Sequence, residues 1–269
     1  MNAHSRVMIG LTLSIAAATT HASTQLGLLA AAETGTPQNF DTYTWLDPLS
    51  SPMQQALAFG GSTAFGAVDL GEGTLRASAH ANNDAVGIAT FAQAGFADAL
   101  HFTSGIGATA YLEYAFHGEL DVEPNPKAVS ISYGTLNMVI GGNRLSGGEY
   151  TIGMAEPYGC SVLTSALLSL GCTEASAVLK TGRIPFEIQE DNYFDMSLVA
   201  TAGPGSTMDL SNTARFYLVL PEGAAFTSNS GRFLTGALPI SPVPEPAPWA
   251  LLAAGVAVLA GIRRRRAPQ

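Results

Sequence analysis

Apolar and polar residues alternate with a period of two over much of the chain, the pattern typical of β-strands with one buried face. In residues 74–81 one face is apolar and the other polar, with Leu75, Ala77, Ala79 and Ala81 on the first and Thr74, Arg76, Ser78 and His80 on the second. Similar runs predict strands at 109–120, 129–139, 150–155, 184–188, 194–201, 208–220 and 226–234. Gly- and Pro-rich turn signals separate these runs. The pattern predicts an all-β fold, an antiparallel β-sandwich of jelly-roll type.

The stretch from residue 37 to residue 61 has no clean period. We expect it to be a loop or to contain a short helix around residues 52–58.

The N-terminal residues resemble a secretory signal peptide. Arg6 and the free amine supply positive charge, and an apolar run from Val7 to Ala18 follows. Small residues at Thr20 and Ala22 predict cleavage before Ser23, so residues 1–22 are expected to be a signal peptide. A buried N-terminal helix is the alternative.

The C-terminal residues predict a membrane helix. Residues 239–248 contain five prolines, which keep the chain extended, and residues 247–262 contain no charged side chain. At about 1.5 Å per residue this run makes a helix of roughly 24 Å, slightly short for a hydrocarbon core of about 30 Å. Trp249 can lie at one interface, and the stop-transfer residues Arg263, Arg264, Arg265 and Arg266 predict that the tail stays cytoplasmic. The alternative is a buried core helix.

Three features in this order resemble the PEP-CTERM sorting signal of Gram-negative bacteria that make extracellular polysaccharide. They are the motif Pro244, Glu245 and Pro246, the apolar run, and the arginine cluster near the terminus. The resemblance implies that a membrane-embedded exosortase recognises and processes residues 239–269. It also implies a transient inner-membrane anchor and a final place at the cell surface or in the matrix. The body, residues 23–238, is loosely similar to the β-rich ectodomain of such proteins, a likeness that implies no catalytic residues.

The charge of the body excludes some partners. The whole chain carries a formal charge of −9 with 12 basic and 21 acidic residues. Without Arg6 and the four tail arginines the body keeps seven basic residues, and Glu245 is the one acid outside it, which leaves twenty. This surface repels phosphate backbones and favours solubility, so we expect no nucleic-acid partner.

The two cysteines, Cys160 and Cys172, are predicted to form a disulfide, because export would place them in an oxidising compartment. The apolar residues between them could form a short helix. A catalytic thiol is the alternative, but no histidine lies within forty residues of the pair.

No G-x-S-x-G, P-loop, H-E-x-x-H or paired C-x-x-C motif occurs. His101 and His117 would form a metal site if paired strands brought them together beside Asp98 or Glu113. We expect them instead on the polar faces of separate strands, and predict no metal site.

Two acidic clusters are candidates for calcium, although solvated acidic faces are the simpler interpretation. One comprises Glu119, Asp121 and Glu123, and the other Glu190, Asp191, Asn192 and Asp195. Tyr43 and Trp45 are the candidate aromatic platform for a sugar.

These features favour a non-enzymatic function. We expect an exported, exosortase-processed structural or interaction component associated with exopolysaccharide or biofilm, without a cofactor. A carbohydrate- or calcium-binding adhesin is the alternative, and a polysaccharide-active hydrolase, which needs two facing carboxylates in a cleft, is a third hypothesis.

Overall fold

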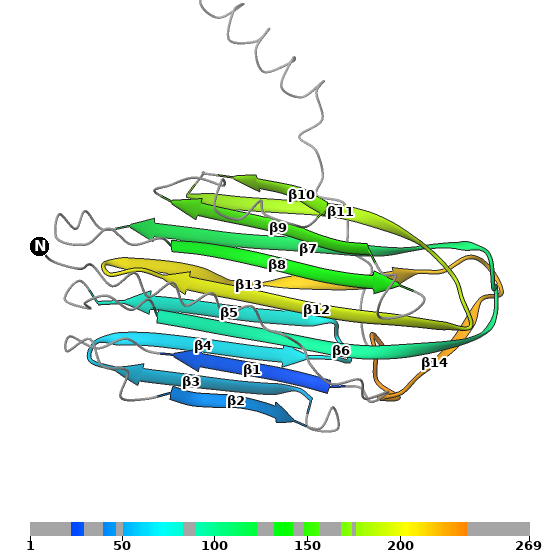
Figure 1. Cartoon of the computed structure of the whole chain (residues 1–269), viewed down its shortest axis with the longest axis horizontal. Coiled ribbons are helices and arrows are strands. Elements are labelled where there is room, and N and C mark those ends of the chain that lie inside the picture. The colour runs from blue at the N-terminus through cyan, green and yellow to red at the C-terminus, as the bar shows by residue number, and fades with distance from the viewer. Residues whose placement is uncertain are drawn as a thin grey trace, which may run out of the picture.

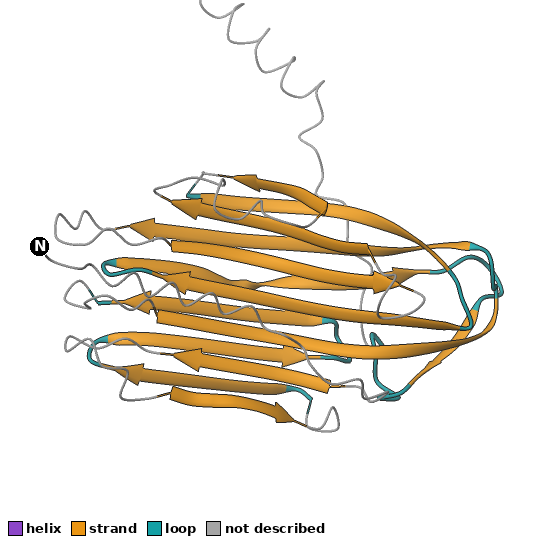
Figure 2. Cartoon of the chain, in the orientation of Figure 1, coloured by secondary structure: helices purple, strands orange, loops and turns teal. Residues whose placement is uncertain are grey.

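The computed structural model describes residues 23–29, 40–46, 51–82, 90–122, 132–141, 148–156, 168–173 and 176–235. None of these residues is helical (Figure 2). The strands are β1 (Ser23–Leu29), β2 (Phe40–Leu46), β3 (Met53–Phe59), β4 (Ser62–Asp69), β5 (Thr74–Ala81), β6 (Thr90–Ser104), β7 (Thr109–Val122), β8 (Ser132–Gly141), β9 (Gly148–Glu156), β10 (Leu168–Thr173), β11 (Ala177–Glu187), β12 (Asp191–Ala202), β13 (Ser206–Val219) and β14 (Ala225–Ser228). The described chain is therefore all-β, as the alternation predicts.

The strands form two sheets, which we call sheet A and sheet B. Sheet A has the order β10-β9-β8-β12-β6-β1-β2, with β14 pairing with β6 in addition. Sheet B has the order β11-β7-β13-β5-β4-β3. Among the described strands the pairing of β10 with β9 is parallel, and all other pairings are antiparallel. The sheets lie one behind the other in the view of Figure 1.

The core lies between the two sheets, because each contributes its apolar face. Phe96 of β6 in sheet A meets Phe216 of β13 in sheet B edge to face, with ring centroids 5.7 Å apart. Phe194 of β12 and Phe186 of β11 make the same kind of contact at 5.2 Å. All four rings are buried, so the interior is one continuous apolar layer that joins the sheets into a sandwich-like fold.

Strands pair across the fold in a nested order. The pair formed by the strands farthest apart in this part of the sequence is β5 with β13. Inside it β6 pairs with β12, and inside that β7 pairs with β11. The connection from β6 to β7 runs beside the connection from β11 to β12, because Gly107 N donates to Ile188 O at 2.8 Å and Ile188 N donates to Ala108 O at 2.9 Å. The two long strand pairs therefore cross from one sheet to the other as a hydrogen-bonded ribbon.

The structure corrects the sequence analysis at several places. Residues 53–59, expected as a loop or short helix, form strand β3, because pairing with β4 overrides the local preference. Strands β1, β2, β4, β6 and β10 were not predicted from the pattern. Of these, β2 lies in the stretch 37–61 that was expected as a loop or short helix, and β10 includes residues 168–170, which were expected to belong to a short helix between the cysteines. The strand predicted at 226–234 ends at Ser228, after which a turn contains Gly231 with φ of 65°.

Several predictions concern residues outside the described ranges. The signal peptide 1–22 and the sorting segment 239–269 are among them, and so are Cys160 and Glu123. Within the ranges that the structure describes, no helix has the length and hydropathy needed to cross a membrane.

Candidate functional site

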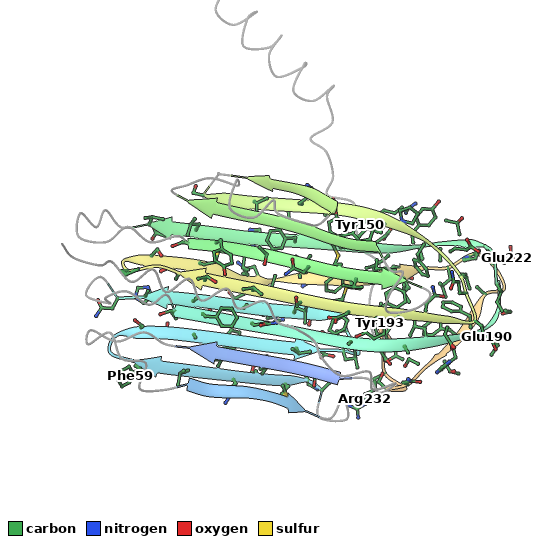
Figure 3. All side chains as sticks on the ribbon, in the orientation of Figure 1. Phe59, Tyr150, Glu190, Tyr193, Glu222 and Arg232 are labelled. Carbon is green, nitrogen blue, oxygen red and sulfur yellow. The ribbon has the colours of Figure 1, made fainter. Side chains whose placement is uncertain are left out.

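Polar side chains gather where the ends of β6 and β12 meet the segment that follows β14. We call Asp98, His101, Asp191, Asn229 and Ser230 the terminal cluster. Glu190, which precedes Asp191, lies at the right-hand end of the molecule in Figure 3, and Arg232, which follows Ser230, lies near its lower corner. Strand register places Asp191 opposite His101, and Thr227 of β14 is also opposite His101.

Asp98 is the buried acid of the terminal cluster. Its side chain is fully shielded from solvent and accepts hydrogen bonds from Ser230 Oγ at 2.5 Å and from Ala99 N at 2.8 Å. Ser230 N also donates to it, at 3.3 Å. Burial raises the pKa of Asp98 above its ordinary value, and these hydrogen bonds partly oppose the rise. Asp98 therefore holds the turn after β14 against the end of β6.

His101 joins three elements at the surface of the same end. Its Nε2 lies 2.7 Å from Asn229 Oδ1, and its Nδ1 lies within hydrogen-bond distance of an Asp191 carboxylate oxygen. Because both partners offer oxygens that accept, the doubly protonated ring satisfies both. The hydrogen bond to Asn229, followed by that to Asp191, raises the pKa of His101.

Residues 225–235, which we call the closing segment, continue from the terminal cluster across the end of the core. Phe233 is buried between the rings of Phe96 and Phe194, with centroids 5.9 and 5.4 Å away. Arg232 Nη1 donates to Ser51 O at 2.7 Å, and Leu234 N donates to Leu70 O at 3.0 Å. The closing segment thus fastens sheet A to the residues that precede β3 and follow β4 in sheet B.

The candidate metal site at His101 and His117 does not assemble. His101 is on β6 in sheet A, whereas His117 is on β7 in sheet B. His117 Nε2 is 3.7 Å from Glu119, and Glu113 pairs with Arg183 at 2.5 Å. Among the described residues no group of three or more His, Cys, Asp or Glu side chains is arranged to hold a metal ion.

The residues of the two acidic clusters have different surroundings in the fold. Glu119 and Asp121 lie exposed on one face of β7, as alternation predicts. In the second cluster Asn192 is buried and closes a turn, because its Oδ1 accepts from Gln189 N at 2.9 Å and its Nδ2 donates to Glu187 O at 3.1 Å. The neighbouring Asp191 is hydrogen-bonded to His101.

The remaining candidates are placed only through their backbone. Tyr43 and Trp45 belong to β2, where Trp45 pairs with Gln25 of β1. Cys172 belongs to β10. The sorting motif and the arginine cluster lie outside the described residues.

The hydrogen bonds of the terminal cluster join segments that are far apart in the sequence. Ser230 Oγ donates to Asp98, and His101 faces a carboxylate and an amide oxygen. Asn229 and Ser230 were not identified from the sequence. Asn229 lies 128 residues from His101 in the sequence, and Ser230 lies 132 residues from Asp98. The polar residues around them form no motif that would predict these contacts.

In comparisons with known proteins, no protein-family model matches this sequence, and no curated protein matches it.

Proposed function

We propose that this chain is an exported, exosortase-processed protein of the cell surface or extracellular matrix, with a non-enzymatic structural or interaction function. The observation that carries the proposal is the order of three features in the sequence: the motif Pro244-Glu245-Pro246, the uncharged run 247–262, and the arginines 263–266. An extended, proline-held segment beside a membrane helix offers its backbone to a membrane enzyme, which a helix would not do.

The position of β1 supports removal of residues 1–22. Strand β1 begins at Ser23 and lies inside sheet A, between β2 and β6. Its Thr24, Leu26 and Leu28 side chains are buried. Cleavage before Ser23 therefore leaves all of β1 in the body, so export and folding are compatible.

We further propose that the body is a β-sandwich of jelly-roll type. The nested pairings give β6-β12-β8-β9 in one sheet and β5-β13-β7-β11 in the other, the order in which a long antiparallel ribbon folds into two Greek keys. β1 and β2 extend the first sheet and β3 and β4 the second.

The uses of the polar residues support a non-enzymatic function. Asp98, His101 and Asn192 belong to the sequence-predicted clusters, and each holds backbone or a neighbouring segment in place. Together with the acidic surface, this favours a stable, soluble surface domain that stays dispersed among exported polymers. The partners we propose are the exosortase and, at the final location, exopolysaccharide.

The test replaces Pro244, Glu245 and Pro246 by alanine in the full chain, with Pro239→Ala as the matched control outside the motif. We expect the triple variant to accumulate in the membrane fraction while the control reaches the surface or medium like the wild type. Equal distribution of the two variants would disprove recognition of the motif.

A further inference from the structure

The two edges of sheet B differ in how they are protected against pairing with another strand. β11, at one edge, includes Arg183, Glu187 and Pro185, and Pro185 has no N–H to donate. Its Lys180 has the same parity as the buried Ile184 and Phe186, so a charge lies on the inward-facing side. Inward charges and prolines are the devices by which natural edges avoid association.

β3, at the other edge, has none of these devices. Its sequence Met-Gln-Gln-Ala-Leu-Ala-Phe contains no charge and no proline. It pairs with β4, and among the described strands none pairs with it on the opposite side. Figure 1 shows it below β4 at the lower edge of its sheet. An uncharged regular edge strand is a template for another strand.

The turn that follows β3 determines which backbone groups face this edge. Gly60 and Gly61 have φ of 55° and 81°, and Phe59 is paired with Ser62, so the hairpin has a two-residue turn closed by that pair. Odd-numbered residues of β3 therefore direct their N–H and C=O groups toward β4. Gln54, Ala56 and Ala58 direct theirs outward.

We propose that a second copy of this chain pairs with β3 through its own β3, in antiparallel orientation about a twofold axis at Ala56. In this register Ala56 faces its own copy and Gln54 faces Ala58 of the other chain, so all the outward backbone groups of the three residues find partners. The sheets B of the two copies become one continuous sheet.

The side chains of β3 fit this pairing. Gln54, Ala56 and Ala58 are exposed on the outer face. None of the three side chains is charged, so no like charges oppose each other in the paired strands. On the inner face Met53, Leu57 and Phe59 are only half-buried. In the paired copies Met53 lies opposite Phe59 and Gln55 opposite Leu57, so the two Met53–Phe59 pairs bring apolar side chains together across the junction. Phe59 is visible at the end of β3 in Figure 3.

The alternative pairing of β3 with β11 of another copy would build an open filament. Lys180 and Pro185 oppose it, because each would interrupt the new ladder or its inner face. A second copy presenting β3 meets neither obstacle, and the contact closes on itself as a dimer.

The experiment measures the dimer dissociation constant of the full chain in mild detergent by sedimentation velocity. Ala56→Lys brings two lysines face to face at the axis, and we expect it to weaken the dimer by at least about tenfold. Ala177→Lys is the matched control, since it adds the same charge at an exposed alanine of the other edge strand of sheet B. It is expected to leave the constant unchanged.

A second pair of variants keeps the test decisive if Ala56→Lys affects folding. Gln54→Lys combined with Ala58→Glu places opposite charges across the axis twice and should preserve a dimer that weakens with salt. Gln54→Lys with Ala58→Lys should be monomeric. A monomeric wild type, or equal effects of Ala56→Lys and Ala177→Lys, would overturn the proposal, and a concentration series extending beyond the dimer would favour the filament instead.

Discussion

Replacing Phe233 by alanine tests whether the closing segment is part of the core. The Phe233 ring is 1 % exposed and contacts Phe96 and Phe194. Removing a fully buried phenylalanine costs about 3–5 kcal/mol, through the lost transfer free energy and the cavity that remains. The range for such truncations already includes the contacts that the ring makes with its aromatic neighbours, so we expect a loss of about 4 kcal/mol in the free energy of unfolding.

The assay is urea unfolding followed by tryptophan fluorescence and circular dichroism, with thermal melting as a second measure. For a domain of this size each kcal/mol lowers Tm by about 2–4 °C, so we expect a Tm lower by roughly 8–16 °C. Phe226→Ala is the matched control, because Phe226 is only partly buried and its ring centroid lies 5.5 Å from that of Phe102. The free energy of unfolding of this control variant should fall by about 1–2 kcal/mol.

A loss for Phe233→Ala that is no larger than that for Phe226→Ala would refute the reasoning. The closing segment would then rest on the surface, held there by contacts such as the hydrogen bonds from Arg232 to Ser51 and from Leu234 to Leu70. An unchanged m-value is also required, since a change would mean that the unfolded state had changed.

Three further predictions concern the same end of the molecule. The pKa of His101 is raised in the fold, so its stabilising contribution is complete below the ordinary value of 6.5 and is lost as pH rises through the raised pKa. His101→Gln should therefore lose more stability at about pH 5.5 than at about pH 8.5 in urea titrations, and an equal loss at both would contradict this. The pKa of Asp98 is also raised, so the fold gains most from this group below its ordinary value of 3.8 and loses that gain as pH rises through the raised pKa. Asp98→Asn should reduce the fall in unfolding free energy between about pH 4 and pH 7, and an unchanged slope would show that Asp98 does not cause it. At Gly73, with φ of 62°, a Cβ would lie 2.2 Å from Leu234 Cδ2 and 2.8 Å from Phe216 O. Gly73→Ala should cost about 2–4 kcal/mol, whereas Gly223→Ala, with a similar φ and open space around it, should cost about 1 kcal/mol by the same titration.

The strands that were predicted correctly have one face that is buried more deeply than the other. β5 is the clearest case, because residues 74–81 alternate throughout and the strand has the same bounds. β6 was missed because residues 92–98 are all buried, so this half of the strand shows no alternation between a buried and an exposed face. Periodicity reports a difference between two faces, and residues 92–98 have none.

β3 was misjudged for a different reason. Gln, Ala, Leu and Met favour helices, and the prolines before it obscure the short period. The informative signal was the Gly60-Gly61 pair, which is typical of a two-residue hairpin turn. The terminal cluster was beyond prediction, because Asp98 and Ser230 meet only once the ends of β6 and β14 have been paired.

The central claim is that the C-terminal segment is a sorting signal that an exosortase removes. Its most direct test is the intact mass of the protein recovered from cells with and without the exosortase, together with fractionation. We predict a mass lacking the residues beyond Pro244-Glu245-Pro246, and release from the membrane, only when the enzyme is present. A mass that retains residues 249–269 in both strains would contradict the claim and would make the segment a permanent membrane anchor.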